Sequence, residues 1–390
     1  MLPKKIYAHL SLMKACITED LFGRRIKLAS KTTSAAKVYR PKVFATLMTE
    51  VLKPGKCVGC GTCVAVCPVS VLKFKPVPGK DEEPALAGKC ILCEFCYNQC
   101  PMTPPGEKEL EELIFGRPSS ENEPYGIYKG IYAVRALNEE ILKTASDGGA
   151  VTAILAYGLA EGLLQGAVVA DTRADMPWKP VPKLATKFED LVRAAGTKYS
   201  VAPMGLAVAE AVDGYQLEKI GFVGTPCQVR SIRKMQYGSW GAIKYGGKVK
   251  LVIGLFCSEN FYYDKLIKEF VASKVDPAKV TKFAIKAGKF VVEAAGEKAI
   301  EVKIKEVQPY ARENCKYCTD FAANLADLAA GNIDSPEGWS TVIVRTEIGE
   351  KFLRGAEEKG WIEVKPLELG TDSLLYKLSS RKRSKAEGKA

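Results

Sequence analysis

The stretch CVGCGTCVAVCP at residues 57–68 is followed thirty-three residues later by CILCEFCYNQCP at residues 90–101, with the same spacing, C-x₂-C-x₂-C-x₃-C-P. Such short spacings suit a tight loop whose thiolates converge on one cubane, and the proline ends the helical turn. A structural zinc site, the main alternative, uses four ligands, usually as two pairs, and has no need of a third cysteine at this spacing. A disulfide framework is typical of short secreted chains. The two runs therefore predict iron–sulfur clusters.

This run is typical of bacterial two-cluster ferredoxins, in which the fourth cysteine of each run binds the other cluster. We therefore expect two 4Fe–4S clusters with exchanged fourth ligands. The predicted ligands are Cys57, Cys60, Cys63 and Cys100 for one cluster, and Cys90, Cys93, Cys96 and Cys67 for the other.

The length and charge of the chain limit its class. Its 390 residues allow a small cluster module and one large domain, or two medium domains. The net charge of +12 lies at the two ends, residues 1–45 and 381–390, so that residues 46–380 are neutral. A nucleic-acid binder carries its basic stripe on the folded domain, so we expect no nucleic-acid partner. The basic ends are expected to be solvated tails, or to contact an acidic subunit or anionic lipid.

Histidine is nearly absent, since His9 is the single one in the chain. Imidazole acid–base catalysis and histidine-bound metals are thus excluded, and electron or hydride transfer by cofactors is favoured. The most apolar window, residues 148–170, contains Glu161 and Gln165 and is too polar for a membrane span. We expect a cytoplasmic protein, with any membrane attachment peripheral on the cytoplasmic face.

The sequence divides into five segments. We expect a basic appendage that is disordered or not native (1–47), a ferredoxin-like α+β module with two β-hairpin units (48–105), a polar linker with a short helix at 107–115 (106–130), a large domain (131–375) and a basic tail (376–390).

The large domain alternates apolar runs with helical patterns. Buried strands are predicted at 131–137, 166–170, 219–224, 251–257 and 341–346. This alternation predicts an α/β domain on a largely parallel sheet. The stretch 283–307 alternates in short segments and predicts a small antiparallel β insertion.

A third cysteine quartet lies in the large domain, and Cys16 is the thirteenth cysteine of the chain. Cys227 and Cys257 follow predicted strands, at the rim where open α/β sheets bind ligands. Cys315 and Cys318 form a C-x-x-C pair. The four either bind a third 4Fe–4S cluster, or are two buried cysteines and a redox dithiol.

Two glycine-containing segments are candidates for a phosphate-bearing cofactor. TASDGGAVTAIL (144–155) predicts Ser146 or Asp147 as the N-cap of an apolar helix whose free N–H groups favour an anion. AAGTKYSVAPM (194–204) is a loop rich in glycine and hydroxyls, with Lys198. Taken alone, the first is better explained as an ordinary capped helix with a packing glycine pair.

Several motifs occur together in one order: RALNEEILKTASDGGAVTAIL, GTKYS, GTPCQVRSIRK, GLFCSENF, CKYCTDFAANLADLAAGNI and GWSTVIVRTEIG. Over about residues 125–375 they resemble the family of beta subunits of coenzyme F420 hydrogenases and dehydrogenases. The resemblance implies FAD, the deazaflavin coenzyme F420 as substrate, and the third 4Fe–4S cluster. With its N-terminal two-cluster module, the chain is most similar to the input subunit of F420H2 dehydrogenases.

The resemblance also implies the residues of the site. FAD is expected at Ser146, Gly148, Gly149, Thr152, Gly196, Thr197, Lys198, Tyr199, Thr225, Gln228 and Arg230. Arg233 and Lys234, with Lys198 and Arg230, are candidates for the acidic tail of the deazaflavin. No side chain is assigned as catalytic, because hydride transfer to FAD needs positioning more than an acid or base.

The resulting hypothesis is an oxidoreductase that oxidises reduced F420 through FAD and sends single electrons along the clusters to partner subunits. A membrane-bound quinone or methanophenazine reductase complex is one such partner. Two alternatives stay open: the F420-reactive beta subunit of a hydrogenase or formate dehydrogenase, and a non-enzymatic polyferredoxin-like electron carrier.

Overall fold

A computed structural model describes residues 40–173, 175–238 and 241–388. The chain divides into two units, Met1–Arg40 and Pro41–Ala390, and the helices and strands of the described residues belong to the second. Most of the predicted appendage, 1–47, lies outside the described residues. Among those that are described, no helix combines the length and apolar composition needed to cross a bilayer.

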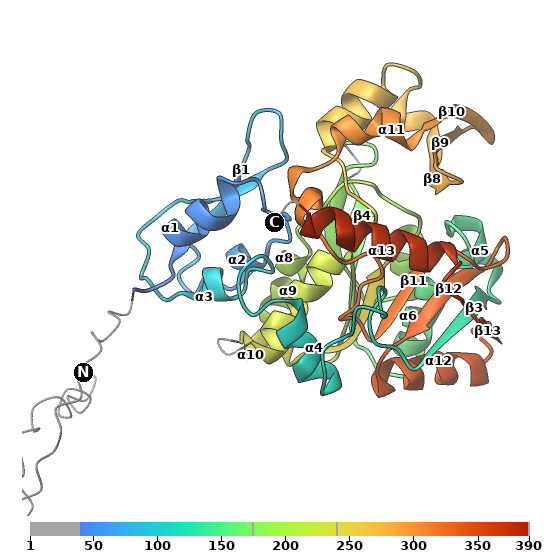
Figure 1. Cartoon of the computed structure of the whole chain (residues 1–390), viewed down its shortest axis with the longest axis horizontal. Coiled ribbons are helices and arrows are strands. Elements are labelled where there is room, and N and C mark those ends of the chain that lie inside the picture. The colour runs from blue at the N-terminus through green and yellow to red at the C-terminus, as the bar shows by residue number, and fades with distance from the viewer. Residues whose placement is uncertain (1–39, 174, 239–240, 389–390) are drawn as a thin grey trace, which may run out of the picture. The chain divides into compact units, whose positions relative to one another are not determined.

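An eight-stranded mixed sheet forms the centre of the large domain, in the order β13-β3-β12-β11-β7-β6-β4-β5 (Figure 1). The strands are β3 (Gly130–Ala136), β4 (Gly166–Thr172), β5 (Pro180–Ala185), β6 (Ile220–Gly224), β7 (Val249–Leu255), β11 (Leu328–Gly331), β12 (Ser340–Val344) and β13 (Ile362–Pro366).

The middle of this sheet is parallel. β4, β6, β7 and β11 pair in parallel, whereas the strands on both sides pair antiparallel. The predicted α/β class is confirmed, and every strand that the sequence predicted is present. β5, β11 and β13 were not predicted: β11 has only four residues, and β5 and β13 contain prolines, which edge strands tolerate.

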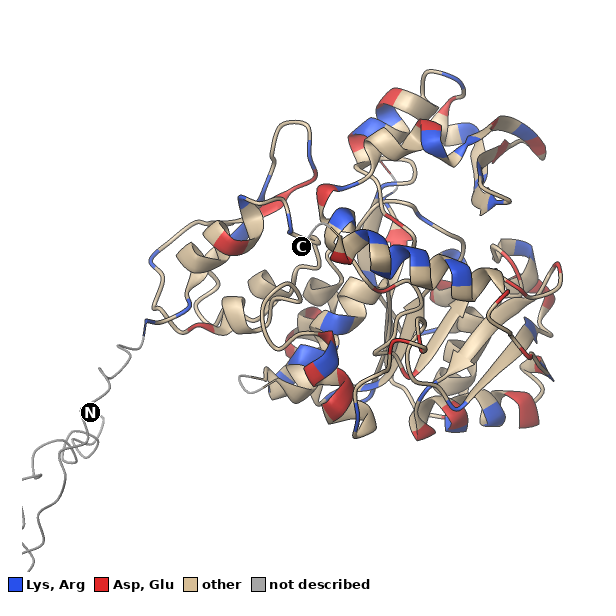
Figure 2. Ribbon diagram, viewed as in Figure 1, with Lys and Arg blue, Asp and Glu red and all other residues tan. Residues whose placement is uncertain are grey.

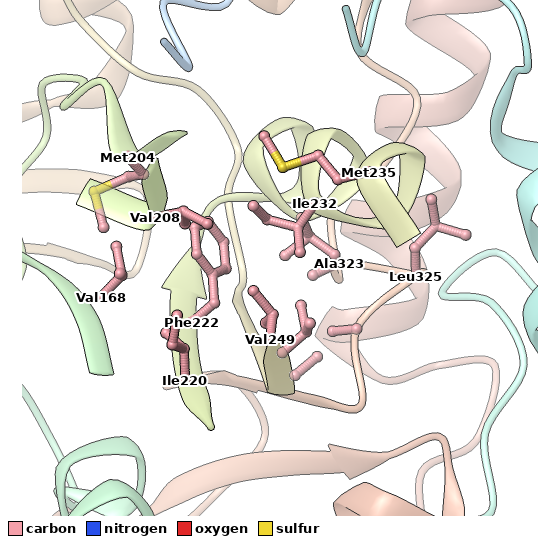
Figure 3. Packing of buried hydrophobic residues seen from close by; sticks show 14 of the residues in the cluster. Val168, Met204, Val208, Ile220, Phe222, Ile232, Met235, Val249, Ala323 and Leu325 are labelled. Atoms are coloured by element: carbon pink, nitrogen blue, oxygen red, sulfur yellow. The ribbon is translucent and has the colours of Figure 1, made fainter. Parts of the chain in front are cut away.

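Helices cover both faces of the sheet. α6 (Ala150–Ala160) and α12 (Glu347–Glu358) pack on one face, with α5 (Glu139–Thr144) and α7 (Phe188–Arg193) beside them. α8 (Met204–Ala209), α9 (Pro226–Tyr237) and α10 (Ile243–Gly246) belong to the other face. In Figure 3 the side chains of Met204, Val208 and Ile232 surround Phe222 of β6, which is fully buried.

The predicted antiparallel insertion is present as a separate three-stranded sheet. It consists of β8 (Val280–Lys286), β9 (Lys289–Ala294) and β10 (Glu297–Lys303), with the helical segments η3 (Asp264–Val271), η4 (Pro277–Lys279), α11 (Ile304–Val307) and η5 (Gln308–Tyr310). Phe261, Phe283 and Phe290 form its own core. Figure 1 shows this lobe above the large sheet.

The cluster module contains α1 (Phe44–Leu47), η1 (Met48–Leu52), α2 (Thr62–Ala65), the hairpin β1 (Leu72–Lys75) and β2 (Glu83–Leu86), and α3 (Phe95–Asn98). Phe44 and Leu47 are buried in its core, so the module begins before residue 48. In the described part of the module there is one hairpin, where the sequence predicted two. The internal repeat is visible instead in the two short helices α2 and α3. Each is preceded by a residue in the left-handed conformation, Gly61 before α2 and Glu94 before α3.

The predicted linker and tail are both packed against the fold. α4 (Glu107–Phe115) has the predicted bounds, yet Leu110 and Glu111 on it are fully buried. α13 (Leu374–Glu387) occupies most of the predicted basic tail and buries Leu375 and Ser379. Within the basic run 381–390, Ala386 is also buried, so the expectation of a fully solvated tail is wrong.

The module is joined to the large domain by close backbone contact between α2 and α8. The amide of Gly205 donates to the carbonyl of Cys60 at 2.8 Å. A Cβ on Gly205 would lie 2.8 Å from the Thr62 nitrogen, and one on Gly61 2.9 Å from the Pro203 carbonyl oxygen. The first cysteine run is thereby held directly on the domain.

Replacing Gly205 with leucine should lower the free energy of unfolding by about 1–3 kcal/mol, because overpacking forces the two backbones apart. Denaturant unfolding of the holoprotein measures the change. Gly214→Leu is the matched control, since the nearest atom to a Cβ there is 3.8 Å away. Equal stability of the two variants would contradict a tight α2–α8 contact.

Candidate functional site

Three cavities are each lined by four cysteines, and the quartets are those expected from the sequence. We call them the outer quartet (Cys67, Cys90, Cys93 and Cys96), the inner quartet (Cys57, Cys60, Cys63 and Cys100) and the domain quartet (Cys227, Cys257, Cys315 and Cys318). The exchange of the fourth cysteine between the two runs is thus reproduced in space: Cys67 lies with the second run, and Cys100 with the first.

The domain quartet collects cysteines from three parts of the fold. Cys227 is in the first turn of α9, after β6; Cys257 follows β7; and the pair Cys315 and Cys318 lies at η6 (Glu313–Tyr317). Burial raises the pKa of Cys227 to about 12, so the free thiol keeps its proton at neutral pH and loses it when a metal binds. Four sulfur donors around one cavity fit a 4Fe–4S cluster.

The inner and outer quartets differ in depth. Cys60, Cys63 and Cys100 of the inner quartet are buried, whereas Cys67 and Cys90 of the outer quartet are half-buried. Lys234 of α9 holds the inner quartet to the domain, donating to the carbonyl oxygens of Cys100 at 2.6 Å, Thr103 at 2.7 Å and Pro104 at 3.0 Å.

A large pocket lies at the carboxyl ends of the central strands, where open α/β sheets bind their ligands. Its empty volume is about 1640 Å³, open solvent included. Ala170, Gly224, Leu255 and Gly331 line it from the ends of β4, β6, β7 and β11. Nine of the eleven predicted FAD residues also line it, namely Ser146, Gly149, Thr152, Gly196, Thr197, Lys198, Tyr199, Thr225 and Gln228.

The two predicted cofactor segments meet in this pocket. The hydroxyls of Ser146 and Thr197 are 2.7 Å apart, and the amide of Thr197 donates to the Ser146 oxygen at 2.9 Å. The helix α6 starts later than predicted, because Gly149, at φ 71°, is its N-cap rather than Ser146 or Asp147. Ala150, Val151 and Thr152, the first residues of α6, line the pocket, and the N–H groups of a first helical turn have no partner within the helix.

Two predicted FAD residues lie elsewhere. Gly148 packs against the sheet, since a Cβ there would come 2.5 Å from both the Ser340 nitrogen and the Val134 carbonyl oxygen. Arg230 lines the cavity of the domain quartet and pairs with Glu107. Sequence spacing alone did not show that one face of α9 turns toward the cysteines.

The large pocket, the domain-quartet cavity and the inner-quartet cavity share lining residues. Val201, Cys257 and Asn260 line both the large pocket and the domain-quartet cavity. Val58 lines both the domain-quartet and inner-quartet cavities. Cys63 and Cys100 of the inner quartet pack in one buried cluster with Cys96 of the outer quartet.

Comparison with known proteins agrees with this geometry. Residues 131–209 match the family model "Coenzyme F420 hydrogenase/dehydrogenase, beta subunit N-term", and residues 217–369 match the companion model for the C-terminal part of the same protein. Residues 56–104 match "4Fe-4S dicluster domain". The chain belongs to the family of coenzyme F420 hydrogenase/dehydrogenase beta subunits. The resemblance noted in the sequence is confirmed, and the members of this family are F420-dependent oxidoreductase subunits.

Relatives within this family differ in how much of the chain they match. Coenzyme F420 hydrogenase subunit beta of Methanothermobacter thermautotrophicus is 43% identical over 67% of this chain and 94% of its own length. A subunit of the F420H2 dehydrogenase of Methanosarcina mazei is 31% identical over 78% of this chain and 84% of its own. A chain of the F420-reducing NiFe hydrogenase complex from Methanosarcina barkeri aligns with TM-score 0.64 and 36% identity, covering 70% of this chain and 94% of that one.

Two of the cations predicted near the deazaflavin have structural partners instead. Arg233 is buried and donates to Asp327 and to the Leu325 carbonyl oxygen, both at 2.7 Å. Lys234 holds the inner quartet, as described above. The expectation that they line the substrate site is therefore wrong, and Lys198 is the one of the four that borders the large pocket.

Sequence reasoning missed several residues around the domain quartet. Arg312, Asn260 and Lys382 line its cavity. Arg312 also donates to the Cys57 carbonyl oxygen at 3.2 Å and pairs with Asp81, which joins this cavity to the module. Asn260 and Arg312 are each three residues from a cysteine of the quartet, whereas Lys382 comes from the C-terminal helix, far away in sequence.

Lys198 should make stability depend on pH in the alkaline range. Burial lowers its pKa to about 8, while its ammonium donates to the carbonyl oxygens of Ala194 and Ala195. Between pH 8 and 10.5 the lysine is protonated in the unfolded chain but largely deprotonated in the folded one. The free energy of unfolding of the wild type, minus that of Lys198→Met, should therefore increase by about 2 kcal/mol as the pH rises through this range. Denaturant unfolding at about pH 7 and about pH 10 measures this difference, and a constant difference would contradict the lowered pKa.

Proposed function

We propose that this chain oxidises reduced coenzyme F420 by hydride transfer to a bound FAD and passes the electrons singly through three 4Fe–4S clusters to a partner complex. The observation that carries the proposal is the shared lining of the cavities: Cys257 and Asn260 belong to both the large pocket and the domain-quartet cavity. A flavin there would lie directly against the first quartet.

The residues of the large pocket suit FAD. The start of α6 offers backbone N–H groups to an anionic pyrophosphate, and the linked Ser146 and Thr197 hydroxyls lie beside it. Apolar residues such as Leu155, Val223 and Phe283 line the remaining walls and suit a flavin ring. Bound FAD would supply the conversion of a two-electron hydride donor into single electrons.

The cysteine quartets supply the path for those electrons. The eight cysteines of the 4Fe–4S dicluster domain would bind two clusters, and the domain quartet a third. Arg312, which contacts the Cys57 loop and lines the domain-quartet cavity, would keep the domain and inner clusters at a fixed separation.

The outer quartet is the proposed exit to the partner. Cys67, Cys90 and Cys93 are half-buried, and Ile91 and Leu92 beside Cys90 are 56% and 59% exposed. Such exposed apolar residues suit contact with another subunit. We propose the input subunit of an F420H2 dehydrogenase on the cytoplasmic face of the membrane, since that relative covers more of this chain than the hydrogenase relative. A hydrogenase beta subunit is the second candidate, favoured by the higher identity.

An anaerobic dye assay tests the proposal. The purified protein should contain about one FAD per chain and, with reduced F420, should bleach an artificial one-electron dye. A polyferredoxin-like carrier would show no flavin band and no bleaching. If the protein contains flavin but does not reduce the dye, the enzymatic assignment would be overturned while the flavin-binding site would remain supported.

A further inference from the structure

The C-terminal helix α13 brings a cation to the domain quartet. It spans Leu374–Glu387 and lies beyond residue 369, where the family match ends. Figure 2 shows basic residues along its length. Lys382 on this helix lines the same cavity as all four cysteines of the domain quartet.

The position of α13 is fixed by its first turn and by its buried face. Asp334 accepts hydrogen bonds from the amides of Leu374 at 3.0 Å and Leu375 at 2.7 Å. Leu375 and Ser379 are fully buried. Lys382 follows Ser379 by three residues, so it lies about one helical turn further along the side that faces the domain.

The ammonium of Lys382 is directed at the quartet. It donates to the carbonyl oxygen of Cys257 at 2.5 Å. This hydrogen bond holds the ammonium beside the sulfur-lined cavity, which Lys382 shares with Cys227, Cys315 and Cys318.

The other cations of the cavity are already neutralised. Arg230 pairs with Glu107, and Arg312 pairs with Asp81. Within the described part of the chain, Lys382 has no ion-pair partner. Asp320 also lines the cavity, and its carboxylate accepts hydrogen bonds from the amide of Asn324 at 3.0 and 3.2 Å. Lys382 is therefore the cation of this cavity that no ion pair neutralises among the described residues.

We infer that Lys382 is a positioning residue that stabilises the reduced state of the cluster held by the domain quartet. The inference rests on the proposed function and adds to it how the first electron acceptor is tuned. One-electron reduction adds one negative charge to the cluster, with the electron supplied by the reduced flavin and no proton or bond exchanged. A fixed cation nearby favours that charge, and cluster potentials respond to net local charge.

Anaerobic redox titration of the holoprotein, followed by electron paramagnetic resonance, tests the inference. Lys382→Met should lower the reduced-to-oxidised ratio of one cluster about tenfold at a given potential, a shift of about 59 mV. Lys382→Arg should keep the wild-type midpoint. Lys385→Met, at an exposed lysine of the same helix, is the matched control and should shift no midpoint.

The outcomes separate this inference from the proposed function. Wild-type protein with about eight iron atoms and two midpoints would refute the third cluster itself. About twelve iron atoms with an unchanged midpoint in Lys382→Met would overturn the role of Lys382 alone. Lys382→Gln removes the charge but keeps a hydrogen-bond donor for the Cys257 carbonyl oxygen, so it controls for a loss of packing in Lys382→Met. Loss of about four iron atoms from both neutral variants would also overturn the inference, since Lys382 would then be needed to retain the cluster.

Discussion

Replacing Cys227 with serine should lower the iron content of the anaerobically purified protein from about twelve atoms per chain to about eight. Cys227 contributes one of four thiols to the domain-quartet cavity, and a serine oxygen is a poor substitute for a thiolate. The eight cysteines of the module are untouched, so the magnetic signal of its two clusters should remain. Dye reduction by reduced F420 should fall roughly 100-fold, because the first acceptor beside the large pocket is lost.

Cys60→Ser is the matched control for this experiment. It should also remove about four iron atoms, but from the inner quartet, and the third cluster should keep its signal. FAD content should be unchanged in both variants. Unaltered iron content in Cys227→Ser would show that the domain quartet binds no cluster, and its cysteines would then be buried thiols and a dithiol.

The two quartets of the module could be predicted because metal ligation imposes short, regular spacings on the chain, whereas the domain quartet was predicted as a cluster site only through the family resemblance. The exchange of Cys67 and Cys100 followed from the repeat, and the structure groups the eight residues in that way. The parallel strands were also predictable, since a strand buried on both faces reads as a continuous apolar run. The strand ends then placed Cys227 and Cys257 at one edge of the sheet.

The residues that join the parts of the fold could not be predicted from the sequence. Lys234 and Arg312 resemble surface charges in the sequence, but tertiary contacts bury them against the cysteine runs. The C-terminal helix has the composition of a basic tail, so its sequence does not indicate that Leu375 and Ser379 are buried. Local pattern shows composition and periodicity, whereas these contacts depend on segments far apart in the chain.

The glycines before α6, beside the large pocket, are a second case in which the sequence context was misleading. Gly149 has the sequence context of a close cofactor approach, but a Cβ there would point into the core, 2.7 Å from Ile141 Cγ2. With φ at 71°, a bulky residue would strain the helix start as well. A substitution at Gly149 would thus test folding rather than FAD binding. Thr152, which lines the large pocket from the first turn of α6, is the better position.

Thr152→Trp should therefore lower FAD occupancy from about one per chain to below about one tenth, with iron content unchanged. The indole would fill space beside the helix start, and overpacking by about 1–3 kcal/mol corresponds to roughly ten- to hundredfold weaker binding. Flavin absorbance and iron analysis of the same sample measure the two quantities. Thr152→Val, which keeps the side-chain volume, should load FAD normally. Full flavin loading in Thr152→Trp would mean that the flavin does not bind beside α6. The proposed electron path would then lack a flavin in the large pocket next to the domain quartet.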